Sequence, residues 1–117
     1  MEAEMAGVVE ATKDTFDELV GSGVVLVDVW AESCQPCATL EPHLKTVAST
    51  YPELTVVKLD ASQARRLCMT LQVRGLPTLL LYQDGTEAAR ITDPNLQPAQ
   101  VDTWLATELD QLGGKEH

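Results

Sequence analysis

Two cysteines separated by two residues, Cys34 and Cys37, are the side chains of this sequence best suited to carry out chemistry. They lie in the stretch VLVDVWAESCQPCATLEPHL, residues 25–44, after a run of β-branched residues and before a helical pattern. A pair with this spacing can be a reactive dithiol, part of a metal site, or two buried small residues. The elements around the pair decide between these interpretations.

The helix expected after the first cysteine favours the reactive dithiol. From Cys37 onward the apolar residues recur at gaps of three and four, which predicts a helix that begins near Cys34. Its free backbone N–H groups and positive dipole end would point at the Cys34 sulfur and lower the pKa of that thiol. Cys37 follows one turn later on the same side. A thiolate at Cys34 can therefore attack a disulfide, and Cys37 can resolve the mixed disulfide.

A zinc site is the main chemical alternative for the cysteine pair. Structural zinc requires four ligands, commonly supplied as two pairs. This sequence has one C-x-x-C, and its other candidate ligands, Cys68, His43 and His117, are scattered along the chain. We therefore expect no metal at Cys34 and Cys37.

Size, charge and composition narrow the class of protein. The 117 residues suit one domain, predicted to comprise residues 1–117 with frayed ends at 1–6 and 113–117. Eighteen acidic and eight basic residues give a net charge of −10, which argues against a nucleic-acid partner. The sequence shows no signal-peptide pattern and no apolar run near the ~20 residues of a membrane helix. We expect a soluble, cytoplasmic monomer that does not bind membranes, a setting in which C-x-x-C indicates redox chemistry.

The elements that must position the cysteines follow a regular alternation. The strand predicted at residues 24–30 is apolar on both faces, which is typical of a sheet covered on both sides. The complete pattern predicts the order βαβαβαββα, with parallel strands first and an antiparallel hairpin last. The predicted elements are a strand at 7–12, a helix within 13–23, the strand at 24–30, the helix after Cys34, a strand at 54–61, a helix within 62–73, a hairpin at 77–92 and a helix at 98–112.

At this point the sequence resembles the thioredoxin family. The segment VLVDVWAESCQPC is similar to the family's active-site segment, and RGLPTLLLYQDG is similar to its proline loop and hairpin. The resemblance extends from about Val8 to about Leu112. It implies an α/β thioredoxin fold, a central mixed β-sheet flanked by helices on both faces, and thiol–disulfide exchange with Cys34 as nucleophile and Cys37 as resolving thiol. We expect no bound cofactor, protein disulfides as substrates, and a thioredoxin-reductase-like electron donor.

Two charged residues interrupt the apolar strands. Asp28 lies within the strand at 24–30, where burial should raise its pKa and allow it to accept the proton of Cys37. The resemblance places the family's buried aspartate here, and a lysine that can pair with it at Lys58. From the sequence alone, Lys58 could equally extend its charged end to the surface.

The substrate-binding surface is expected beside the dithiol. Pro77 opens a strand, a position that tolerates a missing N–H donor. The resemblance implies a cis peptide bond at Pro77 facing the dithiol, with the backbone of Leu76 free to pair with an extended substrate. Trp30 is expected in the core with an edge near the site. The complete predicted substrate-binding set is Trp30, Ser33, Gln35, Pro36, Leu76 and Pro77.

The sequence also departs from the usual family motif, W-C-G-P-C. Ser33 replaces the tryptophan and Gln35 the glycine, while Asp93-Pro94 stands where the family usually has Gly-Ala. Ser33 could cap the helix or hydrogen-bond the Cys34 thiolate. These departures suggest an atypical thioredoxin with a narrow range of substrates. The alternative function is a thioredoxin-fold adaptor whose dithiol is vestigial.

The third cysteine, Cys68, lies on the short predicted helix beside Leu67 and Leu71. We expect a small, half-buried apolar role for it, with a regulatory or dimer-forming thiol as the alternative.

Overall fold

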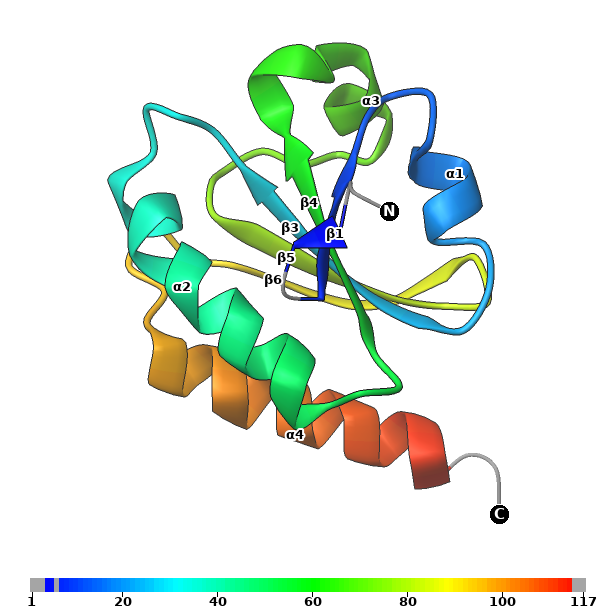
Figure 1. The fold of residues 1–117 in the computed structure, drawn as a ribbon. Coiled ribbons are helices and arrows are strands. Elements are labelled where there is room, and N and C mark those ends of the chain that lie inside the picture. Colours follow the sequence, from blue (N-terminus) through cyan, green and yellow to red (C-terminus); the bar gives the residue numbers. More distant parts are fainter. Residues whose placement is uncertain (1–3, 6, 115–117) are drawn as a thin grey trace.

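The computed structural model describes residues 4, 5 and 7–114 (Figure 1). Six strands form one sheet in the order β1-β2-β4-β3-β5-β6. The strands are β1 (Glu4–Met5), β2 (Val8–Ala11), β3 (Val24–Trp30), β4 (Thr55–Asp60), β5 (Thr78–Gln83) and β6 (Thr86–Thr92). The helices are α1 (Phe16–Leu19), α2 (Gln35–Thr50), the 3-10 helix η1 (Ala61–Gln63), α3 (Arg65–Thr70) and α4 (Pro98–Gly114).

The sheet is mixed, as the sequence predicts. Strand β4 runs parallel to β2 and to β3, whereas β3–β5 and β5–β6 are antiparallel. Strand β3 therefore lies in the middle, between β4 and β5. Its apolar sequence fits this position because its neighbours cover both of its edges and helices cover both of its faces.

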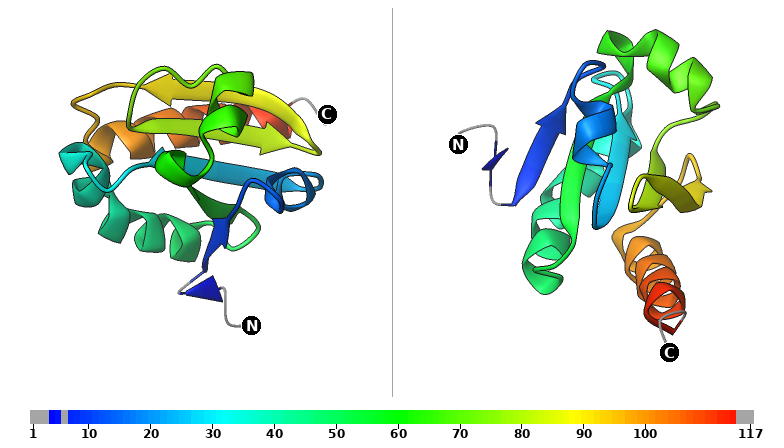
Figure 2. Two further views of the ribbon diagram at one scale, coloured as in Figure 1. Left: turned by 90° about the horizontal axis from the view of Figure 1, so that it is seen from above. Right: turned by 90° about the vertical axis from the view of Figure 1, so that its right-hand side faces the viewer.

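Helices α2 and α4 lie on one face of the sheet, and α1 and α3 lie on the other (Figure 2). Side chains of a strand alternate between the two faces. Leu26 of β3 accordingly packs with α2 and α4, while Val25 and Val27 pack with α1 and α3. Asp28 comes two positions after Leu26, so its side chain points to the face that α2 covers. This alternation brings a carboxyl group of β3 toward the helix that carries the cysteines.

The predicted frayed ends are partly wrong. Glu4 and Met5 form strand β1, which pairs antiparallel with Val9 and Val8 of β2. Two residues give no alternation pattern, so only pairing with the edge of β2 reveals this strand. At the other end α4 continues to Gly114, because the buried side chain of Leu112 anchors its last turns. The other residues of the predicted frayed ends lie outside the described residues.

Helix α1 is short and lies within the predicted segment 13–23, at Phe16–Leu19. The hydroxyl oxygen of Thr12 accepts hydrogen bonds from the backbone N–H groups of Asp14 and Thr15, so a turn leads into the helix.

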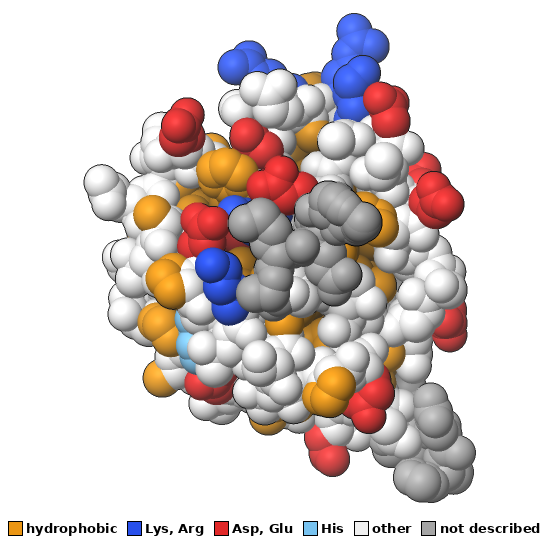
Figure 3. All heavy atoms as spheres, in the orientation of Figure 1, with side chains coloured by type: hydrophobic (Ala, Val, Ile, Leu, Met, Phe, Trp, Pro, Cys, Tyr) orange, Lys and Arg blue, Asp and Glu red, His pale blue; other side chains and the backbone are white. Residues whose placement is uncertain are grey.

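The surface charge is spread out. Figure 3 shows acidic side chains distributed over the face in view, with Lys and Arg side chains gathered mainly at its upper end, near α3. This distribution fits a solvated acidic surface. No helix among residues 7–114 combines the length and apolarity needed to cross a membrane.

Candidate active site

The dithiol lies where β3 leads into α2 (Figure 1). Cys34 and Cys37 form a disulfide, and their Cα atoms are 5.3 Å apart. Cys34 is the N-cap residue of α2, and its sulfur accepts a hydrogen bond of 3.2 Å from the backbone N–H of Cys37. The predicted helix start and its N–H group aimed at the Cys34 sulfur are thus confirmed. Cys34 is half-buried, whereas Cys37 is only 2% exposed. Of these two residues, a second protein can therefore reach only Cys34.

The residues beside the cysteines differ in accessibility. Ser33 and Gln35 are exposed on either side of Cys34, and Pro36 is partly buried in the first turn of α2. One alternative for Ser33 is that it caps the helix, and this is wrong. The cap position belongs to Cys34, one residue later. The contact of Ser33 and Gln35 with a substrate stays a prediction.

Asp28 is the buried acid of the site. Its side chain is 1% exposed, and its Oδ1 atom has no hydrogen-bond partner among the described residues. Burial raises the pKa of Asp28 from 3.8 to about 7; the nearby Lys58 charge lowers the pKa and the Glu41 charge raises it. A carboxyl group with this pKa can both take up and release a proton near neutral pH.

Lys58 is directed toward a different partner from the one predicted. It is the register neighbour of Asp28 on β4, yet its Nζ donates a 2.7 Å hydrogen bond to Oε2 of Glu41. The Nζ atom also lies 4.6 Å from the centroid of the Trp30 ring. Lys58 is therefore a neighbouring charge for Asp28, but its bonded partner is Glu41. Lys58 is 8% exposed, so the surface alternative is also wrong.

Sequence reasoning missed Glu41. It lies four residues after Cys37 on α2, a spacing that places both side chains on one face of the helix. This spacing is the feature of the sequence that could have indicated Glu41 as a residue of the site. Because the sequence predicts that Lys58 faces Asp28 or solvent, it gives no indication that a second acid pairs with Lys58.

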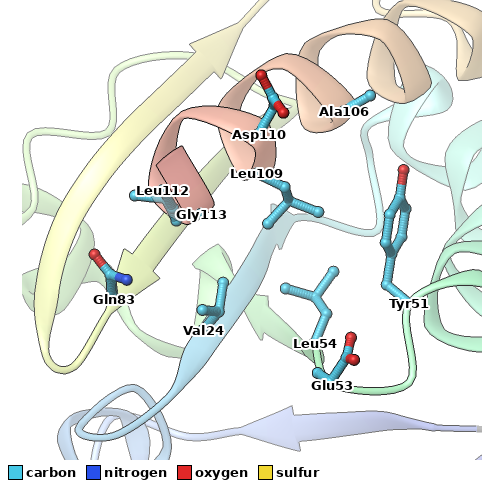
Figure 4. A pocket seen from close by; sticks show the side chains of 10 residues that line it. All are labelled: Val24, Tyr51, Glu53, Leu54, Gln83, Ala106, Leu109, Asp110, Leu112 and Gly113. Carbon is cyan, nitrogen blue, oxygen red and sulfur yellow. The ribbon is translucent and has the colours of Figure 1, made fainter. Parts of the chain in front are cut away.

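A small cavity joins these groups. It has a volume of about 150 Å³ and is lined by Asp28, Trp30, Ala31, Glu32, Cys37, Ala38, Glu41 and Lys58. Cys37, the buried Asp28 and the Lys58–Glu41 ion pair thus border one space. A larger hollow of about 450 Å³ lies at the other end of β3, between Val24, Leu54 and the end of α4 (Figure 4). No thiol lines that hollow.

The proline loop lies next to the end of β3. The Leu76–Pro77 peptide bond is cis, as the resemblance implies. Thr78 follows and pairs in register with Val29, which places Pro77 at the same end of the sheet as the dithiol. The buried Thr78 hydroxyl donates to the carbonyl oxygen of Gly75 at 2.6 Å and lies 2.7 Å from the Thr92 hydroxyl. These bonds hold the loop that precedes β5 against the start of β5 and the end of β6.

We expect Thr78→Val to destabilise the protein by about 1–3 kcal/mol, because it leaves buried polar groups without partners. Because the Gly75 carbonyl then loses its anchor, the KM for a protein disulfide should rise with little change in kcat. Urea unfolding and steady-state kinetics measure the two effects. Thr92→Val is the matched control, since Thr78 keeps its bond to Gly75 there. Equal destabilisation by both variants would contradict the anchoring role of Thr78.

The segment after β6 forms a stiff turn. The carboxylate of Asp93 accepts a 2.8 Å hydrogen bond from the Asn95 N–H, and its carbonyl accepts one of 3.1 Å from the Leu96 N–H. The preceding residue, Thr92, contacts Thr78. The charged residue that replaces the family's glycine therefore lies beside the proline loop.

Cys68 and Trp30 lie in or against the core. Cys68 is a free thiol, 7% exposed, packed among apolar residues such as Phe16, and burial raises its pKa. Its predicted small apolar role is confirmed. Trp30 is half-buried at the end of β3. Trp104, a residue of α4, is partly buried and packs against the core. His43 bonds Asp102 at 2.7 Å across α2 and α4.

In the part of the chain that the structure describes, potential metal ligands are not grouped. Among residues 7–114, no three His, Cys, Asp or Glu side chains lie close enough together to hold a metal ion. His117, one of the scattered candidates, lies outside the described residues.

Comparisons with known proteins identify relatives. Residues 7–106 match the family model described as Thioredoxin. The thioredoxin of Acetoanaerobium sticklandii is 42% identical over 99 residues, which cover 82% of this chain and 94% of that protein. Thioredoxin C-3 of Corynebacterium nephridii is 34% identical over 108 residues, covering 91% of this chain and 74% of that protein. Oxidised mitochondrial thioredoxin 3 of Saccharomyces cerevisiae superposes with a TM-score of 0.76 at 24% identity, over 86% of this chain and 94% of that one, so it shares the fold.

Proposed function

The chain belongs to the thioredoxin family and is a thiol–disulfide oxidoreductase, and we propose that Cys34 is its nucleophile and Cys37 its resolving thiol. The observation that carries this assignment is the difference in burial of the two sulfurs. Cys34 is half-buried at the N-terminus of α2, whereas Cys37 is 2% exposed and borders the cavity of Asp28. The helix terminus favours the thiolate of Cys34 over its thiol.

The first step forms a mixed disulfide. The Cys34 thiolate attacks one sulfur of a substrate disulfide, so that the substrate S–S bond breaks and a bond between Cys34 and the substrate forms. The second substrate sulfur leaves as a thiolate and takes a proton from water. The backbone of Leu76, next to cis-Pro77, lies at the same end of the sheet and can pair with an extended substrate segment.

The second step releases the product. Asp28 in its charged form accepts the proton of the Cys37 thiol, and the resulting thiolate attacks the Cys34 sulfur. The mixed disulfide breaks, the second substrate sulfur leaves as a thiolate that takes a proton from water, and the Cys34–Cys37 disulfide remains. Two electrons have passed from the protein to the substrate. A thioredoxin-reductase-like donor then returns two electrons to the pair, without a cofactor bound to this chain.

The exposed residues around Cys34 define the range of substrates. Ser33 and Gln35 offer polar contacts where the usual motif has tryptophan and glycine, and Asp93 adds a charge beside the proline loop. A substrate surface with these groups should accept fewer protein disulfides than that of a general thioredoxin. The proposal describes a cytoplasmic protein that acts as a monomer, with residues 1–117 as one domain.

Trapping tests the assignment. Reduced Cys37→Ser protein, mixed with a disulfide-containing protein such as insulin, should accumulate a one-to-one covalent adduct, because nothing resolves the mixed disulfide. Intact mass spectrometry detects the adduct, and dithiothreitol should reduce its disulfide and separate the two proteins. Cys34→Ser is the matched control and should give no adduct, since Cys37 is buried.

Two outcomes would count against the proposal. An adduct with Cys34→Ser but not with Cys37→Ser would reverse the two roles. No adduct with either variant, across several protein disulfides and with the thiols shown to be free, would favour the adaptor alternative.

A further inference from the structure

The ammonium group of Lys58 has two carboxylates within reach but bonds only one of them. Lys58 and Asp28 are register neighbours on adjacent parallel strands, so their side chains emerge side by side on the face that α2 covers. Asp28 nevertheless has a buried Oδ1 atom without a hydrogen-bond partner. The Lys58 Nζ is bonded at 2.7 Å to Glu41 instead.

Glu41 is well placed to hold Lys58 in this direction. It lies on α2 above the sheet, and its side chain is 51% exposed while that of Lys58 is 9% exposed. The carboxylate of Glu41 therefore keeps much of its hydration and costs little to ionise, whereas ionising Asp28 requires full desolvation. The ring of Trp30, 4.6 Å from Nζ, supports the ammonium in the same position.

We propose that Glu41 is a positioning residue for the resolving step: by holding the Lys58 ammonium, it keeps that cation from bonding Asp28 and leaves the Asp28 carboxylate free to take the Cys37 proton. This inference rests on the proposed role of Asp28. A lysine bonded to Asp28 would stabilise the carboxylate and make it a weaker base. Glu41 thereby keeps the buried acid basic enough to act near neutral pH.

Charged and titratable groups face Asp28 from several elements. Lys58 faces it from β4, Glu41 and Cys37 from α2, and Glu32 lines the same cavity from the segment before α2. The register neighbour on β5 is the apolar Leu79. Removing the charge of Glu41 withdraws a negative charge and releases Lys58 toward Asp28. Both changes stabilise the Asp28 carboxylate, so both lower its pKa.

Carbon NMR of the Asp28 carboxyl group in the reduced protein gives a direct test. Glu41→Gln should lower the titration midpoint of Asp28 by about one pH unit, a tenfold change in proton affinity. Glu32→Gln removes the same charge from the same cavity without a bond to Lys58, and should change the midpoint by less than about a third of that. Glu41 is half exposed, so its glutamine variant should fold, which thermal unfolding verifies.

A double-mutant cycle separates positioning from simple charge. In a Lys58→Met background, Glu41→Gln should lose most of its effect on the Asp28 midpoint, because there is no ammonium left to redirect. The same shift in both backgrounds would overturn the proposal, as would an unchanged midpoint in the single variant. An equal shift for Glu32→Gln would overturn it as well.

A kinetic measurement tests whether Glu41 affects the release of the mixed disulfide. The release rate of the preformed mixed disulfide, measured against pH, should show its midpoint moved down in Glu41→Gln by the same amount as the NMR midpoint. An NMR midpoint that falls while the rate profile stays unchanged would overturn the role in resolution. That result would refute the proposed function of Asp28 while leaving Lys58 held by Glu41.

Discussion

Replacing Cys34 with serine is expected to lower the rate of protein-disulfide reduction by at least about 1,000-fold, because the proposed nucleophile is lost and no other sulfur can replace it. Serine is not ionised at neutral pH, so the helix terminus has no thiolate to stabilise. Cys37 is 2% exposed and Cys68 is buried on α3 on the opposite face of the sheet, so neither can meet a protein disulfide directly.

Turnover with dithiothreitol as electron donor measures this loss. Cys68→Ala is the control for removing a thiol, and it should keep nearly full activity. Residual activity of Cys34→Ser above about a tenth of wild type would contradict the mechanism, because removing a covalent nucleophile costs far more than that. It would indicate that Cys37 reacts with substrates through an opening that the structure does not show.

The chemistry of the site was predictable because it depends on local patterns. A C-x-x-C between an apolar strand and a helical periodicity indicates both the helix N-terminus and the two sulfurs on one side of it. The burial of Asp28 was predictable because a carboxyl group in a strand covered on both faces must be buried. Each of these inferences uses residues a few positions apart in the sequence.

The contacts that the sequence did not reveal join distant segments. The Lys58–Glu41 ion pair connects β4 to α2, and it depends on which of two nearby carboxylates is easier to ionise. The two-residue strand β1 exists only through its pairing with β2. The sequence allows Ser33 as a helix cap because its pattern places the helix start only to within one residue, and in the structure the cap position belongs to Cys34.

Asp28, the buried acid that we propose takes the Cys37 proton, should also make the protein less stable. Asp28 has a pKa of about 7 in the folded protein against 3.8 for an exposed carboxyl, so the folded state binds this proton more tightly than the unfolded state. Stability from this group is therefore fully present below pH 3.8 and falls as the pH rises to about 7. Above that pH the folded protein contains a buried charge that costs up to about 4 kcal/mol.

Asp28→Asn should remove this loss of stability. The amide has nearly the same shape and stays neutral, so the variant should match wild type near about pH 4 and exceed it by up to about 4 kcal/mol near about pH 8.5. Urea unfolding of the oxidised proteins at several pH values measures the difference. Asp110→Asn, an exposed acid on α4, is the matched control and should stay within about 0.5 kcal/mol of wild type throughout.

The stabilised variant should be a slower enzyme. Without the carboxylate, the Cys37 thiol must lose its proton to water, so release of the mixed disulfide at neutral pH should slow by about 100-fold, at the lower end for loss of a general base. A variant that gained stability at high pH and also resolved the mixed disulfide at the wild-type rate would show that Asp28 is buried without taking the Cys37 proton. A variant with no gain in stability would show that the folded protein does not raise the pKa of Asp28. The two measurements together test whether the cost of burying this acid is linked to its use in the reaction.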